Sequence, residues 1–139
     1  MNKIVTFGIL GLGRVFDIRV AKVFLKELKN SKVVAICDKD QKKINKFKKN
    51  FNCNSYLKTS NFFNQKFDFV YVATESGNHF KHIKEAFKNN KNVIVEKPPV
   101  LKLNHLKILD KMAKKKKLKF YVIFQNRFNK PIIYLKKII

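Results

Sequence analysis

Three groups of residues in this sequence have types and spacing that could carry chemistry, and each directly follows an apolar run. They are Gly11-Leu12-Gly13, Asp38 and Glu96-Lys97-Pro98. Glycines let a backbone approach a phosphate closely, a carboxylate accepts hydrogen bonds from hydroxyls, and a lysine can donate or accept a proton. Together these residue types predict a nucleotide-binding site beside a group capable of proton transfer.

The glycine pair lies between the apolar run 4–10 and a helical pattern. The first glycine permits a tight turn, the second lets the backbone approach a pyrophosphate, and the helix N-terminus adds N–H groups and a positive dipole end. Phe16 occupies the third glycine position of the G-x-G-x-x-G/A fingerprint. The sequence therefore does not decide whether the first helix packs closely on the sheet. We expect Arg14 at a phosphate, or else as a solvated first-turn residue, and we count Val15 among the cofactor-binding residues.

Asp38 ends the second apolar run, 25 residues after Gly13. This is near the spacing at which an acid accepts hydrogen bonds from the adenosine ribose. A carboxylate there repels a 2′-phosphate, so NAD is favoured over NADP, although Lys39 and Arg14 would soften the repulsion. The alternative is that Asp38 is a helix cap or a surface acid beside Asp40.

Glu96-Lys97-Pro98 follows an apolar run at the sheet edge where a nicotinamide should lie. A lysine close to cofactor and substrate can act as acid or base, or can hold a hydroxyl by a hydrogen bond. Pro98 fixes the turn after it, and we expect a cis Lys97–Pro98 bond. In so lysine-rich a chain, the alternative is that a Lys-Pro pair is structural.

The elements that must position these residues alternate between strand and helix. Apolar runs predict six strands, at 4–10, 32–37, 55–57, 69–73, 93–95 and 120–124. Helical spacing follows the glycine turn as far as Leu28, and then recurs at 41–51 behind a cap at Asp40, briefly at 61–63, at 80–87 and at 106–117. This order predicts an α/β fold, a doubly wound parallel Rossmann sheet with helices on both faces. The notable polar residues then all fall on the carboxyl edge, where such sheets bind ligands.

The net charge of +23 would attract nucleic acid, but only three of the 32 basic residues are arginine. Nucleic-acid sites favour arginine for its bidentate fork. The lysines occur in every amphipathic segment, and the excess of Lys, Asn, Ile and Phe is typical of an AT-rich genome. We therefore expect non-specific polyanion binding whatever the function, with a basic nucleic-acid-binding module as the alternative.

Other broad classes are disfavoured by composition. A hydrophobic fraction of 45% with 14 Phe and 4 Tyr is typical of a folded chain, and no apolar run reaches the roughly 18 residues of a membrane span. The N-terminus passes straight into the first predicted strand without room for a signal peptide, so a cytoplasmic protein is expected. Cys37 and Cys53 fit no metal-binding spacing, and no metal site is predicted.

With these motifs the chain resembles the N-terminal domain of the Gfo/Idh/MocA oxidoreductases, the group of glucose–fructose oxidoreductase and inositol dehydrogenase. The similarity extends over residues 8–129 and includes 34–38, 73–79 and 93–98. Residues 73–79 together with 125–129 look most similar to the branch that oxidises the 3-hydroxyl of UDP-linked N-acetylated sugars in surface-polysaccharide synthesis. The resemblance implies an NAD-dependent sugar dehydrogenase.

The resemblance also implies roles for single residues. Lys97 would be the catalytic lysine beside the hydroxyl being oxidised, while hydride passes to C4 of the nicotinamide, and Glu96 would bind the nicotinamide ribose. Four further residues would line the cofactor cleft or approach the nicotinamide and substrate: Thr74, His79, Gln125 and Arg127. His79 could equally be a satisfied residue at a helix start. Arg127 is preferred for an anionic sugar because arginine is scarce here.

Family members continue into a second α/β domain that forms most of the substrate pocket. We expect residues 1–125 to form the NAD(P)-binding domain and 126–139 to begin the connection to that C-terminal domain, which is absent from this sequence. The chain is then a truncated product or half of a split enzyme, completed by a separately encoded domain or a homo-oligomer. Whether it is an enzyme by itself is left open. The alternatives are an inactive fragment and the nucleic-acid-binding module.

Overall fold

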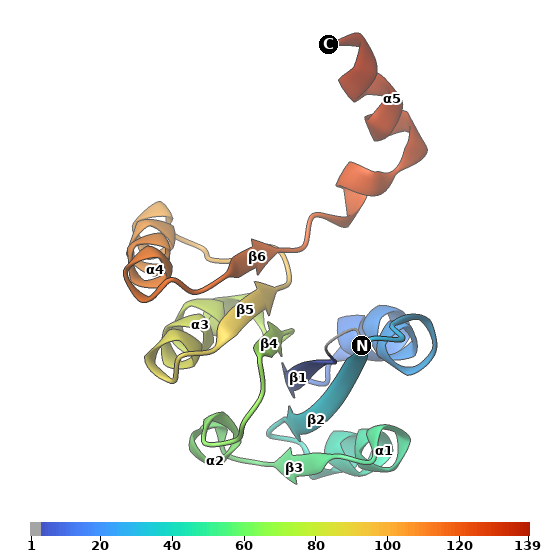
Figure 1. Ribbon diagram of the computed structural model, residues 1–139, viewed down its shortest axis with the longest axis vertical. Coiled ribbons are helices and arrows are strands. Elements are labelled where there is room, and N and C mark those ends of the chain that lie inside the picture. The colour runs from blue at the N-terminus through green and yellow to red at the C-terminus, as the bar shows by residue number, and fades with distance from the viewer. Residues whose placement is uncertain (1–3) are drawn as a thin grey trace.

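The computed structural model describes residues 4–139, which form one six-stranded parallel sheet with helices on both faces (Figure 1). The strands are β1 Val5–Leu10, β2 Ser31–Cys37, β3 Asn54–Tyr56, β4 Phe69–Val72, β5 Asn92–Val95 and β6 Phe120–Val122. Their order is β3-β2-β1-β4-β5-β6, so the chain winds outward from β1 in both directions. This is the Rossmann order, and the predicted doubly wound sheet is confirmed. Residues 1–3, which were expected to lead directly into the first strand, lie outside the described residues.

The helices that precede residue 118 lie where the apolar spacing predicts them, to within a few residues. They are α1 Gln41–Phe51, α2 Thr59–Phe63, α3 His79–Lys88, α4 Leu103–Lys116 and α5 Lys130–Ile138. The helix after β1 contains two π-helical segments, η1 Phe16–Val20 and η2 Val23–Glu27, and 3-10 turns occupy η3 Ser76–Asn78 and η4 Gln125–Phe128. Asp40 caps α1 as predicted, because its carboxylate accepts a hydrogen bond of 2.8 Å from the Lys42 N–H. The strand predicted at 120–124 was too long, since β6 ends at Val122.

Each face of the sheet carries its own apolar core. The η1, η2 and α1 segments cover one face, and α2, α3 and α4 cover the other (Figure 1). Phe16 is fully buried in the first core, with its ring centroid 5.2 Å from that of Phe47 on α1. The first helix therefore packs closely although Phe16 takes the place of the fingerprint's third glycine. A large ring fills the space that a glycine would have left for direct backbone contact.

Gly11 fixes the carboxyl end of β1 against that of β4. Its φ is +94°, and an added Cβ would lie 2.7 Å from backbone atoms of Ala73 and Thr74. Its N–H also donates to the Cys37 carbonyl at the end of β2. A side chain would be strained by the positive φ and would collide with backbone, so the turn requires glycine. Three strand ends thus meet where the polar residues were predicted.

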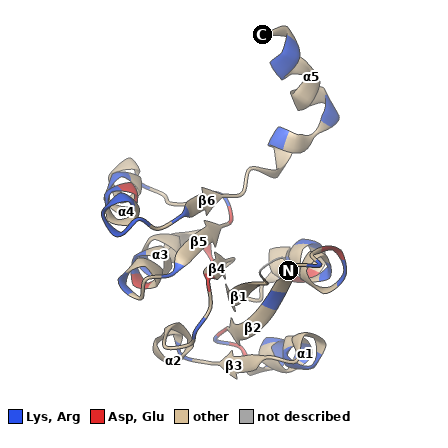
Figure 2. Ribbon diagram, viewed as in Figure 1, with Lys and Arg blue, Asp and Glu red and all other residues tan. Residues whose placement is uncertain are grey.

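The segment after β6 stands apart from the sheet. Figure 1 shows α5 projecting away from the other helices, and every residue from Phe124 to Ile139 is exposed. No helix within residues 4–139 combines the length and apolar character needed to cross a membrane. Lys and Arg lie on α1, α3, α4 and α5 rather than on a single face (Figure 2).

Candidate functional site

Two adjoining cavities lie at the carboxyl edge of the sheet. Cavity A, about 380 Å³, extends toward β2, and cavity B, about 640 Å³, extends toward β5. Both are lined by Arg14, Val15, Ala73, Thr74 and Glu75. Because they share these walls, they form one elongated cleft across the ends of β1 and β4, where the winding direction reverses. Open α/β sheets bind ligands at this point.

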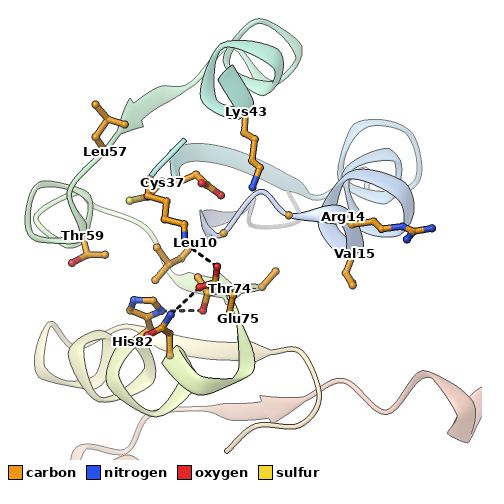
Figure 3. A pocket seen from close by; sticks show the side chains of 16 residues that line it. Leu10, Arg14, Val15, Cys37, Lys43, Leu57, Thr59, Thr74, Glu75 and His82 are labelled. Atoms are coloured by element: carbon orange, nitrogen blue, oxygen red, sulfur yellow. Dashed lines mark hydrogen bonds and ion pairs between the residues drawn. The ribbon is translucent and has the colours of Figure 1, made fainter. Parts of the chain in front are cut away.

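The glycine turn and the end of β2 form one wall of cavity A (Figure 3). Asp38 joins them: its Oδ2 accepts a hydrogen bond of 2.7 Å from the Leu12 N–H, and its Oδ1 accepts one of 2.9 Å from the Asp40 N–H. Asp40, not Asp38, caps the following helix. Each carboxylate oxygen of Asp38 keeps acceptor capacity for a ligand hydroxyl, because an ionised carboxylate offers about four lone-pair sites.

Lys39 and Glu75 form an ion pair at the rim of cavity A, with Nζ and Oε1 2.9 Å apart. The hydrogen bond and charge of Lys39 lower the pKa of Glu75, and the same pairing raises the pKa of Lys39. Asn78 adds a hydrogen bond of 2.9 Å to the other Glu75 oxygen. Both partners are largely exposed, so the pair adds little stability. The ion pair holds one positive and one negative side chain in place beside the carboxyl ends of β2 and β4.

Thr74 lies in the loop that follows β4, between the two cavities, and is bound by two histidines of α3. His82 Nδ1 lies 2.9 Å from the Thr74 hydroxyl, and Figure 3 shows His82 directed toward it. His79 Nε2 lies 2.9 Å from the Thr74 carbonyl oxygen. Burial, followed by electrostatic interaction with Lys81 and His79, lowers the pKa of His82. His82 is thus held neutral in the wall of cavity A.

Cavity B contains the predicted lysine motif. Lys97 is exposed there and has no hydrogen bond or ion pair to any residue within 4–139, and the Lys97–Pro98 peptide is cis as expected. The Glu96 carboxylate accepts a hydrogen bond of 2.5 Å from the Tyr71 hydroxyl. Burial and the neighbouring Glu96 raise the pKa of Tyr71 well above its usual range. The lysine is therefore available to a ligand, while the glutamate is held in place.

His79 lines cavity B but is itself buried, with only 1% of its surface exposed. Its Nδ1 lies 2.7 Å from the Pro98 carbonyl oxygen, opposite the contact to Thr74. The ring thus borders the cleft at the start of α3, with both its nitrogens within hydrogen-bond distance of backbone carbonyl oxygens, and its contact with a cofactor stays a prediction.

Most of the predicted site residues come together in the cleft. Lining residues among them are Gly11, Gly13, Arg14, Val15, Asp38, Thr74, His79, Glu96, Lys97 and Gln125. Arg127 lies exposed on η4, outside the lining of both cavities, so its contact with a substrate stays a prediction. Within residues 4–139, no three His, Cys, Asp or Glu side chains group as a metal site would require.

Sequence reasoning missed several lining residues: Arg19, Lys43, Tyr71, Glu75 and His82. It considered Lys39 only as a charge that softens the repulsion of a 2′-phosphate. His82 could have been found, since it lies three residues after His79 and so on the same helix face. Glu75 lies in the loop that follows β4 at the same edge of the sheet, which also makes it a candidate. Tyr71 and Arg19 had no comparable mark, because one lies inside an apolar strand and the other in a helical segment with exposed charges.

Comparison with known proteins shows the family to which the chain belongs. Residues 5–124 match the GFO_IDH_MocA family model, described as "Oxidoreductase family, NAD-binding Rossmann fold". A curated relative, Oxidoreductase P35 of Formosa agariphila, is 28% identical over 138 residues, covering 98% of this chain and 42% of that protein.

Solved structures share the fold. The WlbA dehydrogenase of Chromobacterium violaceum, in complex with NADH and UDP-GlcNAcA, has a TM-score of 0.90 at 23% identity, covering 99% of this chain and 39% of that one. The scyllo-inositol dehydrogenase of Lactobacillus casei, with bound NAD(H) and scyllo-inositol, has a TM-score of 0.88 at 24% identity, covering 98% and 41%. The chain therefore spans about two fifths of the length of these relatives.

Proposed function

The chain belongs to the Gfo/Idh/MocA oxidoreductase family and is its NAD-binding Rossmann domain; on this premise we propose that the cleft serves oxidation of a sugar hydroxyl. The adenosine half of NAD would lie in cavity A and the nicotinamide half in cavity B. The observation that supports this best is the continuity of the cleft, which connects the Asp38-bound glycine turn to Lys97.

Cavity A fits the adenosine and diphosphate. The Asp38 carboxylate, fixed by two backbone N–H groups, would accept hydrogen bonds from the ribose hydroxyls. An added Cβ on Gly13 would have no protein atom closer than 4.0 Å, so the backbone there is open to a phosphate. Arg14 lies beside it to offset the phosphate charge. The negative charge of Asp38 favours NAD over NADP, whose 2′-phosphate it repels.

In cavity B, Glu96 would accept hydrogen bonds from the nicotinamide ribose, and Gln125 would border the ring. NAD supplies the hydride acceptor, C4 of the nicotinamide. Lys97 would hold the substrate hydroxyl and would take the hydroxyl proton as the carbon-bound hydrogen leaves as hydride. The products are a ketone, reduced cofactor and a protonated lysine, so charge and electrons balance.

For the substrate we propose a UDP-linked sugar oxidised at its 3-hydroxyl, as in surface-polysaccharide synthesis. The support is the charge balance of cavity B, where the cations Arg14, Arg19 and Lys97 outnumber the carboxylates Glu75 and Glu96. The Lys39 pairing offsets Glu75, so the cavity favours an anionic ligand. The free thiols Cys37 and Cys53, together with the use of NAD, support action in the cytoplasm.

We propose that residues 126–139 connect this domain to a substrate domain that closes cavity B. The support is the exposed apolar surface of η4 and α5, which includes Phe128, Ile133, Tyr134, Leu135 and Ile138. Surface of this kind normally marks an interaction site. The second domain could belong to a longer chain, a separate polypeptide or another protomer. Turnover is expected only when it is present.

Cofactor binding by the 139-residue chain tests the proposal. We expect NADH fluorescence titration to give saturable binding, about tenfold weaker NADPH binding, and about tenfold loss in Asp38→Ala. Asp110→Ala is the matched control, since it removes an exposed acid that pairs with Lys114 on α4 outside the cleft. Circular dichroism of each variant separates lost binding from lost folding. Absence of binding at millimolar NAD would contradict the proposal and favour an inactive fragment.

The basic nucleic-acid-binding alternative has less support, because Lys and Arg lie on several helices rather than on one face (Figure 2). It would be favoured if RNA bound tightly with a steep salt dependence while NADH did not bind.

A further inference from the structure

His79 is the only polar side chain buried to this degree within residues 4–139, and it connects two loops. One loop follows β4 and contains Thr74, and the other follows β5 and contains Pro98. The ring nitrogens lie 2.9 Å from the Thr74 carbonyl oxygen and 2.7 Å from the Pro98 carbonyl oxygen. A single side chain therefore spans the loops that carry the shared wall of the cleft and the lysine motif.

The chemistry of these contacts restricts the form of the ring. Backbone carbonyl oxygens only accept hydrogen bonds, and neutral imidazole carries a single N–H. A neutral ring would satisfy one carbonyl and turn a nitrogen lone pair toward the other. Both contacts are hydrogen bonds only when both nitrogens carry hydrogen, which is the imidazolium. A charge-assisted bond is also the stronger kind, as a buried cation requires.

We propose that His79 is an imidazolium and a positioning residue for Lys97. By holding the Pro98 carbonyl against Thr74, it fixes the residue that directly follows Lys97 relative to the shared wall of the cleft. Thr74 is held a second time, since His82 binds its hydroxyl. The lysine loop is thereby tied to the wall that also borders cavity A. The catalytic role of Lys97 in this inference rests on the proposed function, whereas the protonation state of His79 does not.

The surroundings of the ring bear on this assignment. Charged or titratable side chains that line cavity B with His79, or face it from α3, are Arg14, Arg19, Tyr71, Glu75, His82, Glu96 and Lys97. Glu75 is paired with Lys39, and Glu96 is bound by Tyr71. No carboxylate within residues 4–139 bonds to His79, so the two carbonyls are the groups that stabilise its charge.

Nitrogen-15 NMR of the ring nitrogens tests the charge state directly. The chain has only three histidines, His79, His82 and His105, so single His→Gln variants assign every signal. At neutral pH we expect His79 to show two slowly exchanging ring N–H groups, because it is buried, and His82 to show the neutral form. A neutral His79 with a single ring N–H overturns the proposal. This measurement uses the unmodified chain, so it decides even if a variant fails to fold.

The positioning role is tested by His79→Gln, with His105→Gln as the matched control. His105 stacks on Phe80 with ring centroids 3.8 Å apart and lines neither cavity. In His79→Gln we expect the backbone amide signals of Lys97 and Val100 to shift and NADH affinity to fall about fivefold or more, with neither effect in the control. Unchanged Lys97 and Val100 signals in folded His79→Gln overturn the role. If the unmodified chain shows both ring N–H groups but binds no NADH, the proposed function fails and the assignment of His79 stands.

Discussion

The Tyr71 hydroxyl donates a hydrogen bond of 2.5 Å to the Glu96 carboxylate. Tyr71 lies within β4, where it pairs with Ile94 of the neighbouring β5, and Glu96 follows the end of that strand. The Tyr71 ring belongs to the apolar core on the η1 and α1 face, with 5% of its surface exposed. A core side chain thus extends to the cleft and fixes the carboxylate next to Lys97.

Tyr71→Phe should therefore affect both stability and cofactor binding. The substitution keeps the ring but leaves the Glu96 carboxylate without its donor, and hydrogen bonds to charged groups contribute about 1.5–3 kcal/mol. We expect the free energy of unfolding, measured with urea, to fall by about 1–3 kcal/mol. NADH affinity should fall several-fold, since a released carboxylate no longer faces the ribose in one fixed position.

The control for this variant is Tyr121→Phe. Tyr121 is about half exposed on β6, and its hydroxyl has no hydrogen bond to any residue in the described range 4–139. Its removal should leave both measurements unchanged. Equal effects of the two substitutions would show that the contact with Glu96 contributes nothing specific.

Three glycine-to-alanine substitutions separate folding from binding. Gly11→Ala should destabilise the chain by about 3 kcal/mol or more, because the residue has a positive φ and the new Cβ meets backbone at 2.7 Å. Gly13→Ala should fold normally, since its nearest protein atom is 4.0 Å away, but should weaken NADH binding about tenfold by occupying the approach of the diphosphate.

Gly77→Ala is the control, because nothing lies within 4 Å of its added Cβ. Thermal unfolding and NADH titration of the three variants provide the comparison. If Gly13→Ala bound NADH as the unmodified chain does, the glycine turn would not be the diphosphate site.

The sequence was sufficient to predict the parallel sheet and the residues that lie at the ends of its strands. Apolar runs locate β1, β2, β4 and β5, and the ends of parallel strands converge on one edge, so Gly11, Asp38 and Glu96 could be placed together before any coordinates. β6 was overestimated because Ile123 and Phe124 continue its apolar run. The strand ends where its partner does: β5 stops at Val95, whose partner on β6 is Val122.

Contacts between segments distant in sequence could not be predicted. Tyr71 is indistinguishable from a core aromatic until β4 and β5 are in register, and only then does its hydroxyl meet Glu96. His79 likewise shows no sign of its two carbonyl partners, since one of them lies 19 residues away on another loop. Spacing identifies which residues share an edge, whereas the partner of each side chain depends on how the loops close over that edge.

Releasing Lys39 from its ion pair should change cofactor preference. Lys39 directly follows Asp38 and pairs with Glu75, which offsets its charge. In Glu75→Gln we expect NADPH affinity to rise about threefold to tenfold, with NADH affinity nearly unchanged, because the freed cation can pair with the phosphate. Asp110→Asn, which breaks the exposed pair with Lys114, is the control. An unchanged ratio of NADPH to NADH affinity would show that Lys39 does not face that phosphate.

Both thiols should be unreactive in the folded chain. Burial raises the pKa of Cys37 to about 12 and that of Cys53 to about 11, and only the thiolate attacks a disulfide reagent. At about pH 8 we expect an aromatic disulfide reagent to modify neither thiol rapidly, with Cys53 the faster of the two, and to modify both after unfolding in guanidinium. Cys53→Ser leaves only the Cys37 reaction to be followed. Equal rates in folded and unfolded chains would mean that β2 does not bury Cys37.

Acid should destabilise the chain through His82. Burial against Thr74, together with the positive charge of Lys81, lowers the pKa of His82 below its ordinary value of 6.5. Above that value the folded and unfolded chains both hold the neutral ring, so His82 gives no pH dependence. As the pH falls below 6.5, His82 of the unfolded chain binds a proton, whereas His82 of the folded chain binds one only at lower pH. The free energy of unfolding therefore decreases over this window, down to the folded-state pKa.

Urea unfolding of the unmodified chain and of His82→Gln at about pH 7.5 and about pH 5 measures this contribution. Glutamine can still accept a hydrogen bond from the Thr74 hydroxyl but cannot titrate, so the loss of stability on acidification should be smaller in the variant. His105→Gln should lose as much as the unmodified chain. Parallel behaviour of all three would show that His82 is solvated in the folded chain, whereas a flatter curve for His82→Gln alone places the neutral histidine in the wall of cavity A.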